Sequence, residues 1–439
     1  MTRTMKDSGV EWIGQIPKNW TLKRLQYILK ERNELNSPIK TKNILSLTVQ
    51  QGVVPYAQRA GGGNKAKEDL TAYKVVYKND IVLNSMNVIA GAVNLSKYYG
   101  CVSPVYYMLY NDNPAVTKYY NLLFQTEVFQ KSLFGLGNGI LVKESSNGKL
   151  NTIRLRIPMD KLNKLPLPLP SLSEQQAIAN YLDDKCAQID NITATINEQL
   201  GVLKQYKKSV ITEAVTKGLD PNVPMKDSGV EWIGQIPEHW EVIRLKYLAA
   251  FNPPINNVDL NKEISYMPME CLKNGYMIPH TKLFADLVNG LTGFYEGDIV
   301  MAKVTPCFEN GNIAIAQNLV NNTGYGSTEI YVFRCNKILT KFLFYYLQNE
   351  LFKNKAKSTM MGTGGLKRVS SQFTKNLSVL FPPLSEQQAI ADYLDDKCAK
   401  IDAVIADKQA QLETLAAYKK SLIYEYVTGK KSVLGFEEA

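Results

Sequence analysis

One short stretch of sequence occurs twice and constrains the fold of the whole chain. Ser173 to Ala187 reads Ser-Glu-Gln-Gln-Ala-Ile-Ala-Asn-Tyr-Leu-Asp-Asp-Lys-Cys-Ala, and Ser385 to Ala399 repeats it with Asp in place of the Asn. Each copy follows a segment rich in Pro and Leu and has Gln three residues after its Ser, which is the capping-box pattern of a helix start. We therefore expect two long helices, the first running from Ser173 to about Lys217.

Both expected helices carry an apolar residue at every seventh position, which is the seam of a coiled coil. The second seam has one fault, because Lys408 stands where the first has Ile196. A rod about 67 Å long, at ~1.5 Å per residue, needs a partner for its apolar stripe. The sequence thus predicts that the two helices pack antiparallel; the alternative is two separate helices, each lying on its own domain. The expected interface residues are Leu182, Ile189, Ile196, Leu203, Val210, Leu394, Ile401, Leu415 and Leu422, supported by Ile178, Ile192, Tyr206, Ile390, Val404 and Tyr418.

A second repeated element precedes each variable region. Met5 to Pro17 is identical to Met225 to Pro237, and Trp20 and Trp240 follow, so that all four Trp residues lie in this element. We interpret it as a docking segment that packs its indoles against the domain after it. The chain then divides into 1–165 (docking segment and first variable domain), 166–220 (central helix), 221–379 (second docking segment and variable domain) and 380–439 (C-terminal helix).

The two variable regions differ in most positions but share an order of elements. Tyr77 and Tyr295 begin matching Tyr-x-x-Asp-Ile-Val sequences, so we expect one fold for both. This fold is α+β with a mainly β core, and the two domains are joined by the helices as an internal pseudo-twofold repeat. Strand-like runs occupy Asn43 to Tyr56, Tyr73 to Leu83, Val102 to Tyr110, Ile264 to Ile278, Phe294 to Lys303 and Thr328 to Cys335, and helices are expected near Thr117 to Phe134 and Ile338 to Lys355.

Charge and cysteine usage limit the class of protein. Lys plus Arg number 51 and Asp plus Glu 41, a net charge of +10, which suits a polyanionic partner without requiring one. The six Cys residues form no Cys-x-x-Cys pair and only two His residues occur, which argues against a zinc site. No signal peptide and no apolar run of membrane-spanning length are visible, so we expect a cytoplasmic protein.

Catalytic motifs are not convincing in this sequence. Asn252-Pro253-Pro254 resembles an adenine methyltransferase loop, but Ile255 stands where an aromatic ring should stack on the flipped base. Neither a nucleotide-binding Gly-x-x-x-x-Gly-Lys-[Ser/Thr] motif nor a Glu-x-Lys pair of metal-dependent nucleases occurs. We therefore predict no catalytic residues and no metal site in the chain.

The combined pattern resembles a known family. A Trp-Ile-Gly-x-Ile-Pro-x-x-Trp segment, a variable domain and a Ser-Glu-Gln-Gln-Ala-Ile helix start, all present twice, closely resemble the DNA specificity subunit of type I restriction-modification systems. The resemblance covers essentially the whole chain. It implies a non-catalytic subunit whose two target-recognition domains each read one half of a bipartite site in double-stranded DNA.

The resemblance also implies partners. Two methyltransferase subunits would bind the repeated regions, and two restriction (motor-nuclease) subunits can join them. S-adenosylmethionine, ATP and magnesium would belong to those partners, with no cofactor bound by this chain. If the helices set the spacing, inserting one turn (about 5.4 Å) after Ile192 would lengthen the unread spacer by one or two base pairs of about 3.4 Å each. The rival interpretations are an orphan DNA-binding or coiled-coil scaffold and a fused enzyme of another class.

Candidate DNA-contacting residues lie mainly in the basic, glycine-rich loop after each domain's expected helix. Polar and cationic side chains there offer hydrogen bonds to base edges and charges to phosphates. For any one of them, an exposed polar loop residue remains an open alternative. The first choices are Asn138, Lys143, Ser145, Asn147, Lys149, Thr363, Lys367, Arg368 and Gln372, followed by Tyr98, Tyr99, Ser103, Lys303, Thr305, Asn310, Tyr325 and Ser327.

Overall fold

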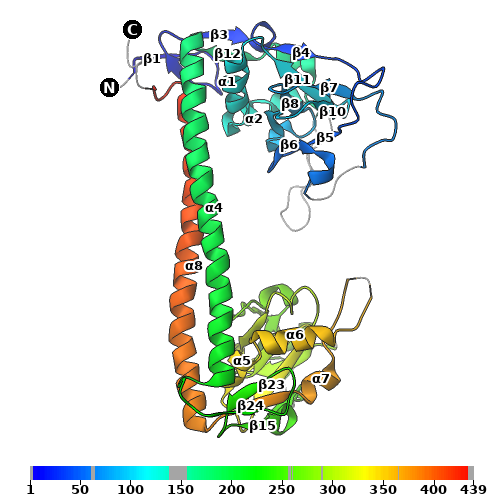
Figure 1. Ribbon diagram of the computed structural model, residues 1–439, viewed down its shortest axis with the longest axis vertical. Helices are drawn as coiled ribbons and strands as arrows, with labels where there is room; N and C mark the ends of the chain where they lie inside the picture. The colour runs from blue at the N-terminus through cyan, green and yellow to red at the C-terminus, as the bar shows by residue number, and fades with distance from the viewer. Residues whose placement is uncertain are drawn as a thin grey trace. The chain divides into compact units, whose positions relative to one another are not determined.

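Two long helices are shared by two structural units in the computed structural model (Figure 1). Helix α4 spans Leu172–Lys217 and helix α8 spans Leu384–Val427. Unit 1 contains Met1–Thr195 and Gln411–Ala439, and unit 2 contains Ile196–Ala410, so the boundary falls inside both helices. The structure describes residues 3–60, 65–137, 156–255, 259, 261–287, 290–363 and 365–433.

The helix starts differ from the expected capping box. Helix α4 begins one residue before Ser173, and the hydroxyl of Ser171 accepts a hydrogen bond from the Glu174 amide at 3.2 Å. Helix α8 begins at Leu384, where the Pro383 carbonyl accepts from the first free amides. The prediction that Ser173 and Ser385 cap the helices is therefore wrong, because the residues just upstream already satisfy these amides.

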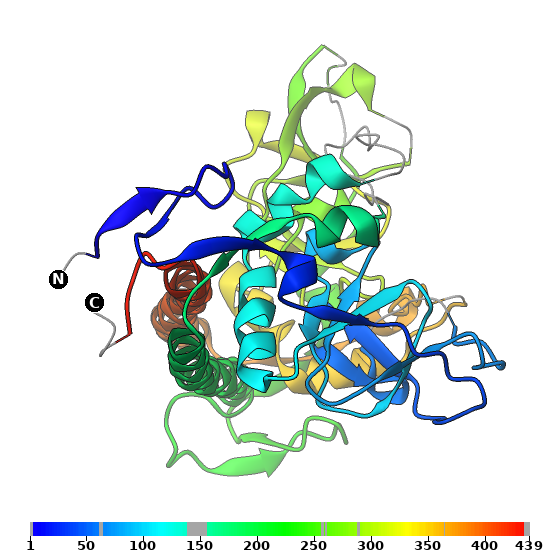
Figure 2. The same cartoon turned by 90° about the horizontal axis from the view of Figure 1, so that it is seen from above.

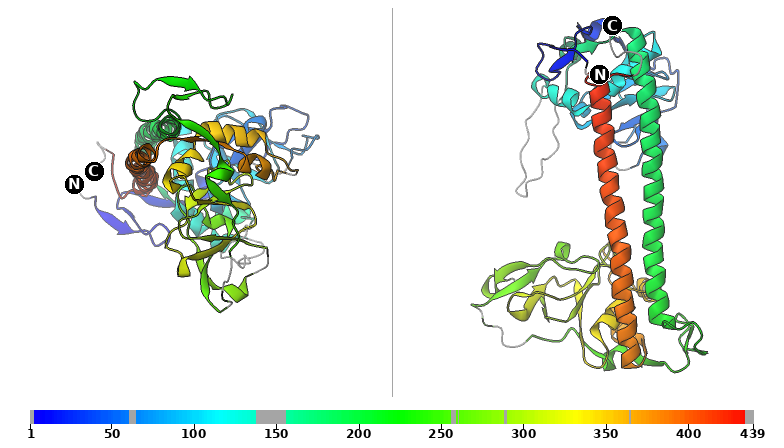
Figure 3. Two further views of the ribbon diagram at one scale, coloured as in Figure 1. Left: turned by 90° about the horizontal axis from the view of Figure 1, so that it is seen from below. Right: turned by 90° about the vertical axis from the view of Figure 1, so that its left-hand side faces the viewer.

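The two helices pair in an antiparallel coiled coil within each unit (Figure 3). In unit 1 the ammonium of Lys419 lies 2.6 Å from the Asp190 carboxylate. Tyr181 and Tyr426 have ring centroids 4.6 Å apart. In unit 2 the ammonium of Lys207 lies 2.7 Å from Asp402. Positions in α8 fall as those in α4 rise, which confirms the predicted pairing and excludes separate helices.

The seam of the coiled coil is largely the predicted one. Seven of the nine interface residues are buried, and Leu203 and Leu415 are half-buried. Lys408 is also half-buried and donates to the Gln199 side-chain oxygen at 2.6 Å. The supporting residues Ile178 and Ile390 are buried as well, but the other four are wrong, because a pair of helices covers only one narrow stripe. The exposed fractions of these four side chains are 49% for Ile192, 48% for Tyr206, 44% for Val404 and 53% for Tyr418.

Unit 1 is built around a four-stranded antiparallel sheet of order β4-β11-β8-β9. The pairs β10-β7, β5-β6, β12-β3 and β1-β2 complete its strands. Helix α1 buries Tyr119 and Tyr120, and the Tyr119 hydroxyl donates to the Val427 carbonyl of α8 at 2.7 Å. Its elements are β1 (Met5–Asp7), β2 (Gln15–Pro17), β3 (Thr21–Arg24), β4 (Lys30–Arg32), β5 (Leu45–Thr48), β6 (Gly52–Pro55), β7 (Lys74–Val76), β8 (Ile81–Asn84), β9 (Val93–Leu95), β10 (Gly100–Val102), β11 (Tyr106–Tyr110), α1 (Pro114–Phe124), α2 (Glu127–Ser132), α3 (Met159–Asn163) and β12 (Pro166–Leu169).

Unit 2 repeats this plan and adds a second sheet. Its four-stranded sheet has the order β16-β23-β20-β21, which matches that of unit 1, and a mixed sheet has the order β18-β17-β22-β19. The hydroxyl of Tyr345 in α5 donates to Asp395 of α8 at 2.7 Å. Its elements are β13 (Met225–Asp227), β14 (Gln235–Pro237), β15 (Glu241–Arg244), β16 (Ala249–Phe251), β17 (Glu263–Met267), β18 (His280–Leu283), β19 (Thr292–Tyr295), β20 (Ile299–Ala302), β21 (Ile313–Ile315), β22 (Thr323–Gly326), β23 (Ile330–Cys335), α5 (Thr340–Tyr346), α6 (Glu350–Ser358), α7 (Ser371–Lys375) and β24 (Ser378–Phe381).

Several expected elements of the variable domains are two shorter ones. The run Asn43 to Tyr56 is the hairpin β5-β6, because Gly52 turns the chain with a φ of 67°. Each expected helix is also divided at an N-cap that the sequence analysis missed. Thr126 accepts from the Phe129 amide at 3.4 Å to begin α2, and Asn349 accepts from the Phe352 amide at 2.7 Å to begin α6.

Each docking segment contacts a repeated long helix. Hairpin β1-β2 lies beside the end of α8 in unit 1 (Figure 2). The indole N–H of Trp20 donates to Glu174 at 2.8 Å, and that of Trp240 donates to Glu386 at 2.9 Å. As expected, the indoles also pack on the following domain, since Trp20 contacts Tyr119 edge-on. Trp20 and Trp240 are therefore each held by the Glu of a repeated Ser-Glu-Gln-Gln sequence.

The described ranges contain neither a membrane-spanning helix nor a metal-binding cluster. No helix there is long and apolar enough to cross a membrane. No group of three or more His, Cys, Asp or Glu side chains there is arranged to hold a metal ion.

Candidate nucleic-acid interface

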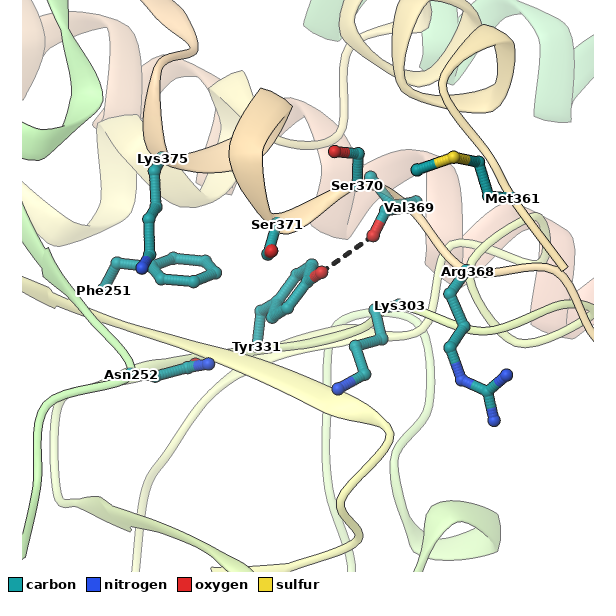
Figure 4. A pocket seen from close by; sticks show the side chains of 10 residues that line it. All are labelled: Phe251, Asn252, Lys303, Tyr331, Met361, Arg368, Val369, Ser370, Ser371 and Lys375. Atoms are coloured by element: carbon teal, nitrogen blue, oxygen red, sulfur yellow. Dashed lines mark hydrogen bonds between the residues drawn. The ribbon is translucent and has the colours of Figure 1, made fainter.

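A basic cavity of about 550 Å³ opens beside the four-stranded sheet of unit 2 (Figure 4). Strands β16 and β23, the residue after β20, the segment before α7 and α7 itself form its wall. Three cationic side chains and no carboxylate belong to the described lining. The lining residues are Phe251, Asn252, Lys303, Tyr331, Met361, Arg368, Val369, Ser370, Ser371 and Lys375.

Tyr331 fixes the segment before α7 against the sheet. It lies on β23 opposite Met301 of β20, and its hydroxyl donates to the Val369 carbonyl at 2.7 Å. The Val369 amide in turn donates to the Lys303 carbonyl at 2.9 Å. The ammonium of Lys303 lies 5.2 Å from the centre of the Tyr331 ring, which is within cation–π range. Lys303 and Arg368 are thereby brought to one cavity from distant parts of the sequence.

Arg368 is held by a carboxylate but remains open to solvent. Its Nε and Nη2 donate to the two oxygens of Glu329 at 2.8 and 2.7 Å. Its side chain is 46% exposed. This hydrogen-bonded pair raises the pKa of Arg368 and lowers the pKa of Glu329. The guanidinium is therefore oriented as a planar fork, a shape that matches phosphate or the guanine edge.

The other cations of the cavity are positioned by aromatic rings. Burial lowers the pKa of Lys303, and the nearby Glu329 opposes that effect. Lys375 lies 5.5 Å from the centre of the Phe251 ring. Asn252 has a φ of 46°, and its side-chain oxygen accepts from the Val332 amide at 2.8 Å, so its role there is structural. Such cations beside hydroxyl groups are suited to binding an anion, not to acid–base catalysis.

Of the predicted contacts in the second domain, Lys303 and Arg368 line the cavity. Thr305 and Lys367 do not line it; the Thr305 amide donates to the Lys367 carbonyl at 2.9 Å. Lys367 in turn donates its amide to the Thr305 hydroxyl at 2.9 Å. Thr305 therefore supports the loop that carries Arg368. Four of the predicted contacts are exposed and lie outside the cavity, namely Thr363, Gln372, Asn310 and Lys367.

Two further predicted residues have structural contacts. Tyr325 lies on β22 and packs against Phe284, with ring centroids 4.9 Å apart. Ser327 accepts a hydrogen bond from the Glu329 amide at 3.1 Å, so it helps to place the carboxylate that holds Arg368. A direct DNA contact remains a prediction for both residues.

The predicted contacts of the first domain fall in two places. Asn138, Lys143, Ser145, Asn147 and Lys149 lie outside the described residues. Tyr98, Tyr99 and Ser103 are described and lie near β10. Tyr99 is 43% exposed and meets the Tyr77 ring edge-on at 5.2 Å. The Ser103 carbonyl accepts from the Tyr106 amide at 3.1 Å.

Most of the cavity could not be predicted from the sequence. Tyr331 reads as an ordinary buried strand residue, and Lys375 is one exposed-looking Lys among many. Phe251 and Asn252 precede two Pro residues, and that motif drew attention only as a rejected methyltransferase loop. No pattern in the sequence relates these positions, because the sheet and α7 bring them together.

The chain contains two domains of the same fold, which share a pair of long helices. The domain of unit 2 has an open basic cavity. These features define a duplicated binding protein. The chain belongs to the family described as type I restriction modification DNA specificity domain, whose model matches residues 17–201 and 237–414. The curated relatives that the chain matches are named as specificity subunits of type I restriction enzymes.

Relatives and a solved structure agree with that membership. The EcoEI specificity subunit of Escherichia coli is 33% identical over 195 residues, 42% of this chain and 33% of that protein. The MjaVIII specificity subunit of Methanocaldococcus jannaschii is 27% identical over 440 residues, covering 95% of this chain and 94% of that one. The chain thus spans a third of the first relative and nearly all of the second.

The fold has a solved counterpart. A structure described as the structural basis underlying complex assembly and conformational transition of the type I R-M system aligns with a TM-score of 0.68 at 14% identity. The alignment covers 95% of this chain and 99% of the other. At this identity the likeness concerns the fold.

Proposed function

We propose that this chain is the DNA sequence-recognition subunit of a type I restriction-modification complex. In this proposal, each variable domain reads one half of an asymmetric bipartite site in double-stranded DNA. The proposal rests on one observation: the fold is duplicated, but the two domains present different side chains. The docking segments and helix starts are repeated almost residue for residue, whereas the cavity residue Lys303 follows β20 at a position where Ser85 follows the equivalent strand β8.

The same proposal includes the partners and the spacer. Two methyltransferase subunits bind the repeated elements, and restriction subunits can join them. S-adenosylmethionine, ATP and magnesium belong to those subunits. The paired helices α4 and α8 set the length of the unread spacer, since each of them contributes to both units.

Substitution of Arg368 tests the reading of DNA. With the full chain expressed beside its genomic neighbour, methylation mapping should show that Arg368→Ala relaxes one base in one half-site and leaves the other half-site unchanged. The loss of a bidentate guanine contact is worth about 1–3 kcal/mol of discrimination. Lys337→Ala is the control, because Lys337 is an exposed cation of the same domain that lies outside the cavity and is not a candidate contact. Equal losses at both half-sites, or none, would contradict the proposal, and failure to capture a methyltransferase would favour the orphan scaffold.

A change in helix length tests the spacer. A heptad inserted into α4 near Thr195 and another into α8 near Glu413 keep the seam in register, because the contact of Asp190 with Lys419 and that of Lys207 with Asp402 flank this region. Each heptad adds about 10.5 Å at ~1.5 Å per residue, or roughly three base pairs of about 3.4 Å. An unchanged spacer in the methylated motif would refute the role of the helices.

A further inference from the structure

Tyr107 of unit 1 occupies the same place as Tyr331 of unit 2. Tyr107 lies on β11 opposite Leu83 of β8, just as Tyr331 lies on β23 opposite Met301 of β20. The Tyr107 hydroxyl donates to the Ile157 carbonyl at 3.1 Å, as that of Tyr331 donates to Val369. The two tyrosines therefore tie equivalent segments to equivalent sheets.

The residue before each tied position is an arginine. The Ile157 amide donates to the Ser85 carbonyl at 2.9 Å, and the Val369 amide donates to the Lys303 carbonyl at the same distance. These bonds place Arg156 and Arg368 alike, each one residue before the position that the tyrosine ties to the sheet. Arg156 is exposed. It lies outside the loop that was predicted to hold the main DNA contacts of the first domain.

A lysine faces the tyrosine ring in both units but comes from different strands. The Lys303 ammonium lies 5.2 Å from the centre of the Tyr331 ring, and the Lys74 ammonium lies 5.6 Å from that of Tyr107. Lys303 follows β20, whereas the residue that follows the equivalent strand β8 is Ser85, whose hydroxyl donates to the Val105 carbonyl at 2.7 Å. Lys74 of β7 supplies the cation that this position lacks.

The electrostatic surroundings of the two lysines correspond as well. The Lys74 ammonium lies 3.9 Å from Glu31, and it donates to the Tyr106 carbonyl at 3.3 Å. Burial lowers the pKa of Lys74, Glu31 opposes this effect, and Arg156 adds to it. Lys303 has the same three influences from burial, Glu329 and Arg368. Both units thus gather a Tyr, a Lys, an Arg and a Glu, although the Lys and the Glu stand at unlike sequence positions. In unit 2 the Glu pairs with the Arg, whereas in unit 1 Glu31 pairs with Lys74.

From this correspondence we infer that Lys74 and Arg156 form the DNA-contacting centre of unit 1, the counterpart of Lys303 and Arg368. The inference rests on the proposed function and names the site within the first domain. Arg156 presents the guanidinium that can contact a guanine edge, while the ammonium of Lys74 neutralises a backbone phosphate. If these residues served only to hold the fold together, no lysine would be needed beside Tyr107, because the hydroxyl of Tyr107 already fixes its ring.

Methylation mapping of single variants tests the assignment in the full chain expressed with its genomic neighbour. Arg156→Ala should change the half-site that Arg368→Ala leaves intact, with a loss of roughly 10- to 100-fold in preference at one base pair. Arg156→Lys keeps the charge without the planar fork, so it should retain methylation and lose the preference. Lys74→Ala should weaken methylation at all variants of that half-site, and Lys78→Ala, an exposed lysine of the same domain, is the control.

The outcomes separate the inference from the proposed function. If Arg368→Ala alters one half-site and neither Arg156 variant alters the other, the inference is overturned and the function stands. If both arginines act on the same half-site, the assignment to unit 1 is likewise wrong. If neither position affects recognition, the reading of DNA through these centres is refuted. Folding is followed by hydrogen exchange of β8 and β11, and the conservative Arg156→Lys variant decides the question if Arg156→Ala fails to fold.

Discussion

The repeated Trp–Glu contact allows one substitution to be made twice in different surroundings. In unit 1 Glu174 is 2% exposed and accepts from the Trp20 indole, and it also pairs with Arg3, which is 8% exposed. In unit 2 Glu386 is 40% exposed and accepts from Trp240 at 2.9 Å. Removal of Glu174 leaves a buried guanidinium and a buried indole N–H without their partner, whereas water can replace Glu386.

We therefore expect Glu174→Ala to cost unit 1 about 3–5 kcal/mol, the usual effect of breaking a buried ion pair. Glu386→Ala should cost unit 2 only about 1 kcal/mol, because water can replace the carboxylate in its contacts with both Trp240 and the exposed His239. At about 1.4 kcal/mol per tenfold change, amides of β3 should exchange with solvent on the order of 10²–10³ times faster in the first variant. Those of β15 should exchange roughly fivefold faster in the second.

Hydrogen exchange with mass spectrometry measures both effects, because peptides from β3 and β15 report on the two units separately. Glu174→Gln is an informative control, since it keeps an acceptor for the Trp20 indole and removes only the charge opposite Arg3. It should lie between the wild type and Glu174→Ala. Equal acceleration of exchange in the two Ala variants would refute the reasoning. It would mean that burial of the ion pair does not raise the cost of removing the carboxylate.

Three further predictions concern single side chains. Gly201→Ala should raise the free energy of unfolding by about 0.8–1 kcal/mol in denaturant titrations, since Gly201 lies inside α4 with no atom within 4 Å of an added Cβ; a loss of stability would show that the helix needs this glycine. Gly324→Ala should instead cost about 1–3 kcal/mol, because its Cβ would lie 2.2 Å from the buried Phe294 ring, and a neutral result in the same titration would contradict the close packing. Burial lowers the pKa of Lys303 below its ordinary value of 10.5, so its charge is lost sooner as pH rises, and DNA affinity should fall at a lower alkaline pH than for Lys303→Arg; identical pH profiles would exclude a charged contact.

The helices could be predicted because their signal is long and redundant. Seven-residue spacing from Leu182 to Val210 specifies both the helix and the buried stripe. The helix starts were misplaced by one residue, since Ser171 and Ser173 are both plausible caps and only the structure shows which amide each can reach. The exposed positions Ile192 and Tyr206 were assigned to the seam because the sequence does not state how many helices share it.

The variable domains could be predicted in class but not in detail. Gly52 and Thr126 divide elements that hydrophobic pattern alone joins, because a single turn or cap residue overrides the propensity of its neighbours. The candidate site was less accessible still. Arg368 stood out in a glycine-rich loop, but Lys74 and Arg156 are separated by most of the first domain, and only the pairing of β11 with β8 brings their surroundings together.

The end of a long helix meets a docking segment in both units, but the two are close in sequence in unit 2 only. In unit 2, Gly218 at the end of α4 lies beside Trp240, and an added Cβ would be 3.3 Å from the indole; the backbone runs continuously from one to the other. In unit 1, Gly429 at the end of α8 lies beside Pro17 and Trp20, with no covalent path between them except the whole length of the polypeptide. The same contact between a helix-end glycine and an indole therefore forms whether the two residues are near or far apart in the sequence, so it does not depend on a short connecting loop.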